Sequence, residues 1–169
     1  MSTSPKIRAM AWALAATFPS VAMAHGDAPS PGSGATAGLA EQMRFGIAGD
    51  PHRITRTIDI DMSDTMRFSP ASIRVRHGET VRLRVTNKGA AQHEMVLGTM
   101  DELRKHAEMM RRFREMEHAE PFIAHVAPGE TGDIVWRFNR AGQFHFACLV
   151  PGHLEAGMIG RVVVDGGRR

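Results

Sequence analysis

The sequence predicts an all-β protein, a β-sandwich with one inserted α-helix. Three observations lead to this fold class. Short segments alternate apolar residues with polar or charged ones, turn residues separate these segments, and one stretch of strong helix formers interrupts them. An alternation of period two places one side chain in a core and the next in water, which is typical of half-buried strands in an antiparallel sheet.

Seven or eight short strands are expected, because Gly, Pro and Asn-rich turns recur between the alternating segments. Such a series of strands is typical of a sandwich of two sheets. The expected strands cover residues 54–62, 73–77, 81–86, 93–97, 122–126, 134–138, 144–148 and 159–164.

The first 24 residues resemble a secretory signal peptide. Lys6 and Arg8 precede a mostly apolar run, and Ala22-Met23-Ala24 has the small-x-small pattern of a cleavage site. The apolar run is short and is interrupted by Pro19, so no membrane span is expected after removal of the signal. We therefore expect export to the periplasm, with cleavage after Ala24.

Residues 25–50 are rich in Gly, Ala, Ser and Pro, and we expect them to form a flexible N-terminal arm. The predicted domain spans residues 51–169. His25 would begin the mature chain, where its imidazole and free amino group can together chelate Cu(II). An ordinary solvent-exposed terminus is the interpretation that we favour.

The inserted helix is expected at about residues 100–118, where Met and His are frequent. Thioethers select Cu(I), so this helix can act as a second copper store or a docking surface. Alternatively, Met110 packs the helix on the sandwich and the other side chains lie on its flanks, which we favour because Met fills irregular gaps. The residues concerned are Met100, His106, Met109, Met110, Met116 and His118.

The charge balance indicates no nucleic-acid partner. Two of the 21 Lys and Arg residues lie in the signal, so the remainder exceeds the 18 Asp and Glu residues by one. Nucleic-acid binding would need a concentrated basic face.

Cys148 is the only cysteine, so it cannot form an internal disulfide. A free thiol in an oxidising compartment is prone to oxidation, and binding of a metal removes this liability. His153 and Met158 follow at intervals of five residues on the same predicted loop. A thiolate, an imidazole and a thioether are a ligand set suited to copper, and His93 is the candidate for a second imidazole.

Three alternatives to copper remain for this loop. Zinc usually takes four strong ligands, and a thioether is a weak one. A thiol nucleophile with a histidine base leaves Met158 unexplained. The third is a buried cysteine near an unrelated surface histidine.

The segment Phe144-His-Phe-Ala-Cys-Leu-Val-Pro-Gly-His153, followed by Gly157-Met-Ile-Gly-Arg-Val162, resembles the copper loop and last strand of the cupredoxins. The spacing is similar to that of rusticyanin-like and auracyanin-like members, and the resemblance covers roughly residues 53–165. It implies a Greek-key β-sandwich with one type 1 (blue) copper per chain. The implied copper ligands are His93, Cys148 and His153, with Met158 axial.

One position departs from the family pattern. Many cupredoxins carry Asn after the first histidine and Ser or Thr after the cysteine, and these side chains link the two ligand loops. Here Glu94 and Leu149 stand instead, so the usual link is not expected to form and the surroundings of copper must differ. An ionised Glu94 near copper would favour Cu(II) and lower the reduction potential.

The ligand set leaves no evident open position for substrate, so we expect electron transfer and not catalysis. The expected redox partners are a cytochrome or a copper oxidase or reductase, in transient contact near His153. The docking patch would comprise Val150, Pro151 and Leu154, with Met95 as a further candidate. The alternative function is copper tolerance by binding or oxidising Cu(I), which would be the one enzymatic activity.

Overall fold

The structure is a computed structural model that describes residues 40–112 and 119–166. The expected signal peptide and most of the expected arm, with His25, lie outside the described residues, as do Met116 and His118. No helix within the described ranges is long and apolar enough to cross a membrane.

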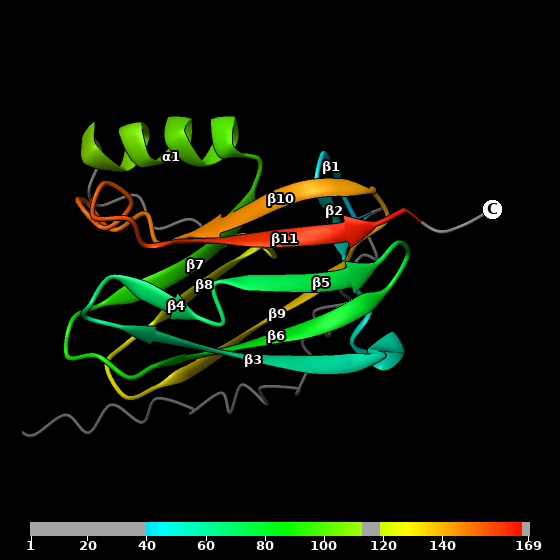
Figure 1. The fold of residues 1–169 in the computed structure, drawn as a ribbon, viewed down its shortest axis with the longest axis horizontal. Coiled ribbons are helices and arrows are strands. Elements are labelled where there is room, and N and C mark those ends of the chain that lie inside the picture. The colour runs from blue at the N-terminus through cyan, green and yellow to red at the C-terminus, as the bar shows by residue number, and fades with distance from the viewer. Residues whose placement is uncertain (1–39, 113–118, 167–169) are drawn as a thin grey trace, which may run out of the picture. The chain divides into compact units, whose positions relative to one another are not determined.

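Two β-sheets form a sandwich, which confirms the predicted fold class (Figure 1). The first sheet has the strand order β1-β2-β9-β6-β3-β4. Its strands are β1 (Gln42–Met43), β2 (Gly46–Ala48), β9 (Thr131–Arg137), β6 (Thr80–Asn87), β3 (Arg56–Ser63) and β4 (Arg67–Ser69). A short 3-10 helix, η1 (Pro51–Arg53), leads into β3.

The second sheet has the strand order β5-β11-β10-β7-β8. Its strands are β5 (Ser72–Arg76), β11 (Ile159–Asp165), β10 (Gly142–Ala147), β7 (His93–Gly98) and β8 (Ile123–Val126). The pairs β3–β6 and β5–β11 are parallel, whereas the other neighbouring strands are antiparallel. Consecutive strands repeatedly cross between the sheets, as expected of a Greek-key sandwich.

The core lies between the inner faces of the two sheets. In β5 and β11 the buried residues alternate with exposed or half-buried ones, as the period of two predicts. All six residues of β7 are buried, because the helix α1 (Met100–Arg112) covers the outer face of the second sheet there. Leu103 and Ala107 of α1 pack with Val96, Ala147 and Leu149 in a separate apolar cluster on that outer face.

The prediction of a flexible arm over residues 25–50 is wrong in its last part, because β1 and β2 within this segment belong to the first sheet. Phe45 is 2% exposed and stacks on Trp136 of β9, with ring centroids 5.2 Å apart. The Trp136 indole Nε1 donates a hydrogen bond to the carbonyl oxygen of Phe45 at 3.1 Å. Met43, Phe45 and Ile47 alternate with Gln42 and Arg44 over a few residues only, and strands of two and three residues are too short to be predicted from such a pattern.

Candidate metal centre

Two neighbouring strands bring the candidate ligands to one end of the second sheet. His93 is the first residue of β7, and Cys148 directly follows the last residue of β10. β7 and β10 are antiparallel, with Ala147 opposite Val96, so the start of β7 lies beside the end of β10. Phe144, Phe146 and Cys148 are all buried in the main core, as their shared strand face predicts.

The loop from Cys148 to Met158 is closed by backbone hydrogen bonds at its base. The Cys148 amide donates to the Met158 carbonyl at 3.1 Å, and the Met158 amide donates to the His153 carbonyl at 2.9 Å. Gly152 and Gly157 have φ of 91° and 87°, where glycine is favoured because a Cβ adds steric strain. The loop therefore returns on itself within eleven residues and directs Met158 into the core beside Cys148, where it is 0% exposed.

The ligand atoms of His93, Cys148 and His153 all lie within 4.8 Å of one another. The Cys148 Sγ is 3.2 Å from the His153 Nδ1 and 3.9 Å from the His93 Nδ1. The two imidazole Nδ1 atoms are 3.2 Å apart. Donors that bind one ion at roughly 2.0–2.3 Å lie about 3–4 Å from each other, so these three atoms fit a common metal ion.

The chemistry of these donors fits copper. A thiolate and two imidazoles with a weak thioether form the ligand set of blue-copper sites. His93, Cys148 and Met158 are all 0% exposed, and His153 is half-buried. The Glu94 amide N–H points at the Cys148 Sγ, 3.5 Å away, and can stabilise a thiolate there.

Burial keeps Cys148 as a neutral thiol in the metal-free protein. Burial raises the pKa of the thiol to about 12, and the nearby Glu94 carboxylate adds to the effect. The pKa of His153 is lowered, first by burial and then by the neighbouring imidazole of His93. Binding of a metal at this site therefore displaces the thiol proton, whereas the His153 imidazole is ready to bind as a neutral ligand.

The second ring nitrogen of His93 contacts a carboxylate. The His93 Nε2 lies 3.0 Å from the Asp64 Oδ1, in the turn between β3 and β4. The amides of Ala90 and Ala91 donate to the same carboxylate at 2.7 and 3.2 Å. These two amides, followed by His93, lower the pKa of Asp64 below its ordinary value.

Glu94 joins the two ligand segments by a link that differs from the usual side-chain pair. Its buried Oε1 accepts a hydrogen bond from the Leu149 backbone amide at 3.1 Å. The glutamate carboxylate therefore takes the place of the expected side-chain pair, since the Leu149 backbone supplies the donor. Its Oε2 lies 2.9 Å from the Nδ1 of His125 on β8, which brings a third strand into the network.

Arg67 on β4 contacts the far end of the ligand loop. Its Nη1 donates to the carbonyl oxygens of Ala156 at 3.1 Å and Gly157 at 3.4 Å. These two carbonyls directly precede Met158 in the chain. The β3–β4 turn thus contacts both ligand segments, through Asp64 on one side and Arg67 on the other.

Helix α1 lies next to the ligand loop that follows β10 (Figure 1). Leu149 is buried under α1, and Leu154 of the loop packs against the same apolar cluster. Arg111 of α1 forms an ion pair with Glu155 at 2.9 Å. Part of the apolar surface expected near His153 is therefore covered by the helix.

One residue of the expected docking patch is misplaced. Met95 is 0% exposed and belongs to the main core, so the prediction that it lies on the docking surface is wrong. Pro151 is exposed, whereas Val150 and Leu154 are half-buried.

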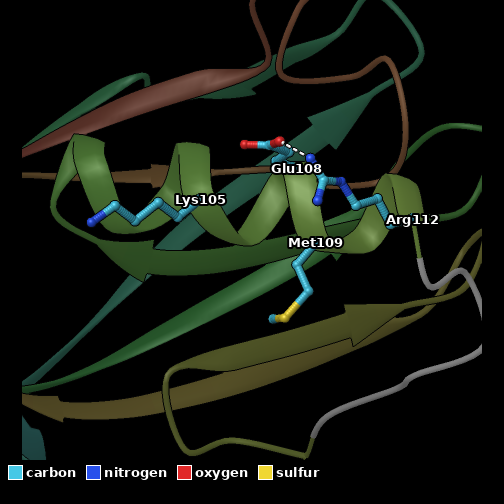
Figure 2. A pocket seen from close by; sticks show the side chains of 4 residues that line it. All are labelled: Lys105, Glu108, Met109 and Arg112. Carbon is cyan, nitrogen blue, oxygen red and sulfur yellow. Dashed lines mark hydrogen bonds and ion pairs between the residues drawn. The ribbon is translucent and has the colours of Figure 1, made fainter.

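The helix methionines and histidines lie mainly on the flanks of α1. Met100, His106 and Met110 are half-buried, while the residues that pack α1 on the sheet are Leu103 and Ala107. Met109 is 39% exposed and points away from the helix, on a different side from the Glu108–Arg112 ion pair (Figure 2).

The structure brings His93, Cys148 and His153 together and buries Met158 in the same core, as the spacing suggests. Sequence reasoning missed Asp64 and Arg67 near this site. Asp64 lies in a turn and Arg67 begins a three-residue strand. No sequence motif connects either of them with the ligand segments, which lie 25 or more positions later.

The fold and the site together define a cupredoxin, a β-sandwich protein whose copper-binding residues lie at one end of the sandwich. The sequence model of the family "copper binding proteins, plastocyanin/azurin family" matches residues 54–165. This chain belongs to that family, and copper is its cofactor.

Relatives and solved structures agree with this assignment. The chain is 54% identical to the copper-resistant cuproprotein CopI of Rubrivivax gelatinosus over 71% of this chain and 73% of that protein. It is 32% identical to the CopI of Pseudomonas aeruginosa over 79% of this chain and 90% of that protein. The reduced auracyanin of Roseiflexus castenholzii, 20% identical, shares the fold with a TM-score of 0.57, over 66% of this chain and 98% of the auracyanin.

Proposed function

We propose that this protein acts in copper tolerance by binding copper at His93, Cys148 and His153, with Met158 as the axial ligand. The observation that carries the proposal is that the ligand atoms of His93, Cys148 and His153 lie within 4.8 Å of one another. The likeness to proteins named copper-resistant cuproproteins supports the choice of copper tolerance.

The contributions of the chain itself are to hold the donors and to exclude water from them. The buried thiol releases its proton on binding, and the Glu94 amide N–H is placed to stabilise the resulting thiolate. Phe146 and Met158 are both 0% exposed and lie in the same buried apolar cluster as Cys148. Copper, when bound, supplies reversible one-electron chemistry.

A growth experiment tests the proposal. A strain that lacks this protein should grow poorly at raised copper, and the wild-type chain should restore growth. Cys148→Ser should fail to restore growth, whereas His52→Gln, which changes an exposed histidine far from the ligands in sequence, should restore it. Full protection by Cys148→Ser would contradict the proposal.

A second candidate function is that of a single-electron carrier. The closed and mostly buried ligand set favours it, because a rigid site changes little when one electron is gained or lost. In this case the loop near His153 would dock transiently on a cytochrome or a copper oxidase or reductase. The half-buried His153 beside the exposed Pro151 is the natural point of contact.

Copper stoichiometry and growth separate the two candidates. One copper per chain and no copper-sensitive phenotype on deletion would favour the carrier. In that case Leu154→Lys should slow electron exchange with a c-type cytochrome, and an unchanged rate would exclude Leu154 from the contact. Additional Cu(I) bound through His25 or the methionines of α1, with copper sensitivity, would favour tolerance.

The periplasm is the compartment in which we propose that either function operates. The proposal rests on the signal-like first 24 residues. Amino-terminal sequencing of the secreted chain should find His25 as its first residue. A chain that retains Met1 would contradict this location.

A further inference from the structure

The turn between β3 and β4 carries a carboxylate that contacts a copper ligand from outside the ligand segments. Asp64 lies 29 residues before His93 in the chain, yet the Asp64 Oδ1 is 3.0 Å from the His93 Nε2. His93 is 0% exposed, so this contact is buried on the imidazole side, whereas the Asp64 side chain is 46% exposed.

The geometry fixes which nitrogen of His93 can bind metal. An ionised carboxylate only accepts hydrogen bonds, so the Nε2 that contacts Asp64 must carry the proton. The Nδ1 then presents its lone pair, and it lies on the side of the Cys148 Sγ and the His153 Nδ1. Without the carboxylate, either nitrogen of a neutral imidazole can carry the proton.

Asp64 is itself held in place by the loop that precedes His93. Its Oδ2 accepts from the Ala90 amide at 2.7 Å and its Oδ1 from the Ala91 amide at 3.2 Å. Gly89 permits this approach, because a Cβ at this position would collide with the Asp64 carboxylate. The carboxylate is therefore oriented by its own contacts and does not depend on His93 for its position.

We propose that Asp64 is a positioning residue of the copper site, which holds His93 in the Nδ1-binding tautomer and strengthens it as a ligand for Cu(II). A carboxylate behind a metal-bound imidazole raises the basicity of the ligand and orients its ring. The negative charge favours Cu(II) over Cu(I), so Asp64 lowers the reduction potential. This inference rests on the proposed copper site.

The test compares Asp64→Asn and Asp64→Ala with Asp61→Asn. Asp61 is an exposed acid of β3, and its substitution makes the same change in net charge close to the same turn. Cu(II) affinity, measured by competition with a chelator, should fall about 10- to 100-fold in both Asp64 variants and remain at the wild-type value in Asp61→Asn. The reduction potential should rise in the Asp64 variants only.

A measurement on the metal-free protein separates failure of this inference from failure of the copper site. Long-range ¹H–¹⁵N correlation spectra of the imidazole should show a protonated Nε2 of His93 in the wild type and mixed tautomers in Asp64→Ala. Absence of copper binding by the wild type would overturn the proposed function. If the wild type binds copper but the Asp64 variants match Asp61→Asn in affinity, potential and tautomer, Asp64 only caps the turn and the inference is overturned.

Discussion

The proposed copper ligands come from two segments that differ in how they are held. The loop from Cys148 to Met158 carries three of the proposed ligands, closes on itself by backbone hydrogen bonds and has its conformation encoded by adjacent residues. His93 stands alone at the start of β7, and its orientation depends on Asp64 from another sheet. A compact loop can thus be recognised from spacing, whereas a single ligand needs support from distant parts of the chain.

The largest expected effect follows from removing the sulfur donor of the loop. Cys148→Ser should abolish the intense visible thiolate-to-copper absorption that Cu(II) produces in the wild-type protein, because the sulfur donor is removed. The absorption spectrum after addition of Cu(II) checks this result. A band that persists in Cys148→Ser, or its absence from the wild type, would contradict the blue-copper site.

The next effect concerns the proton of the same thiol. Since the pKa of Cys148 is raised to about 12, the thiol stays protonated throughout the range from about pH 7 to pH 9. Each rise of one pH unit increases the thiolate fraction tenfold, so the affinity for Cu(I) should rise about tenfold per unit. Chelator competition at several pH values measures this slope, which should be missing in Cys148→Ser.

A third prediction concerns Glu94, which joins the two segments. Glu94→Ala leaves the Leu149 amide buried without its acceptor and should lower the free energy of unfolding by about 1–3 kcal/mol. Glu94→Gln retains an acceptor oxygen and should lose less stability, while the reduction potential rises because a negative charge is removed. Thermal unfolding and redox titration give the two quantities; an unchanged or lower potential in Glu94→Gln would contradict the role of its charge.

The smallest effect concerns the contact between α1 and the loop. The Arg111–Glu155 ion pair is half exposed, so Arg111→Met should change the free energy of unfolding by no more than about 1 kcal/mol. Arg104→Met changes another exposed arginine of the same helix and serves as the matched control. A loss well above that of Arg104→Met would mean that the ion pair, and not the packing of Leu154, holds the loop against α1.

The same contrast explains what the sequence could predict. Alternation and turn residues predicted the sandwich, the helix and most strands, because these signals are local. The segment 42–48 was missed because its place in the sheet depends on Phe45 stacking on Trp136, more than 90 residues later. The resemblance indicated that the usual side-chain link would not form at Glu94 and Leu149. It could not indicate what replaces the link, since the Leu149 backbone donor carries no side-chain signature.

The position of β11 has a consequence for the order in which the molecule assembles. β11 pairs with β10 and, in parallel, with β5, so its place in the sheet depends on contacts separated by about 90 residues. Such non-local pairings are slow to form, because a long stretch of chain must first be brought together. Met158 directly precedes β11, so the position of Met158 in the core depends on the docking of this last strand. The complete set of donors, with Met158 in its place in the core, is therefore expected only once the last strand has joined the sheet.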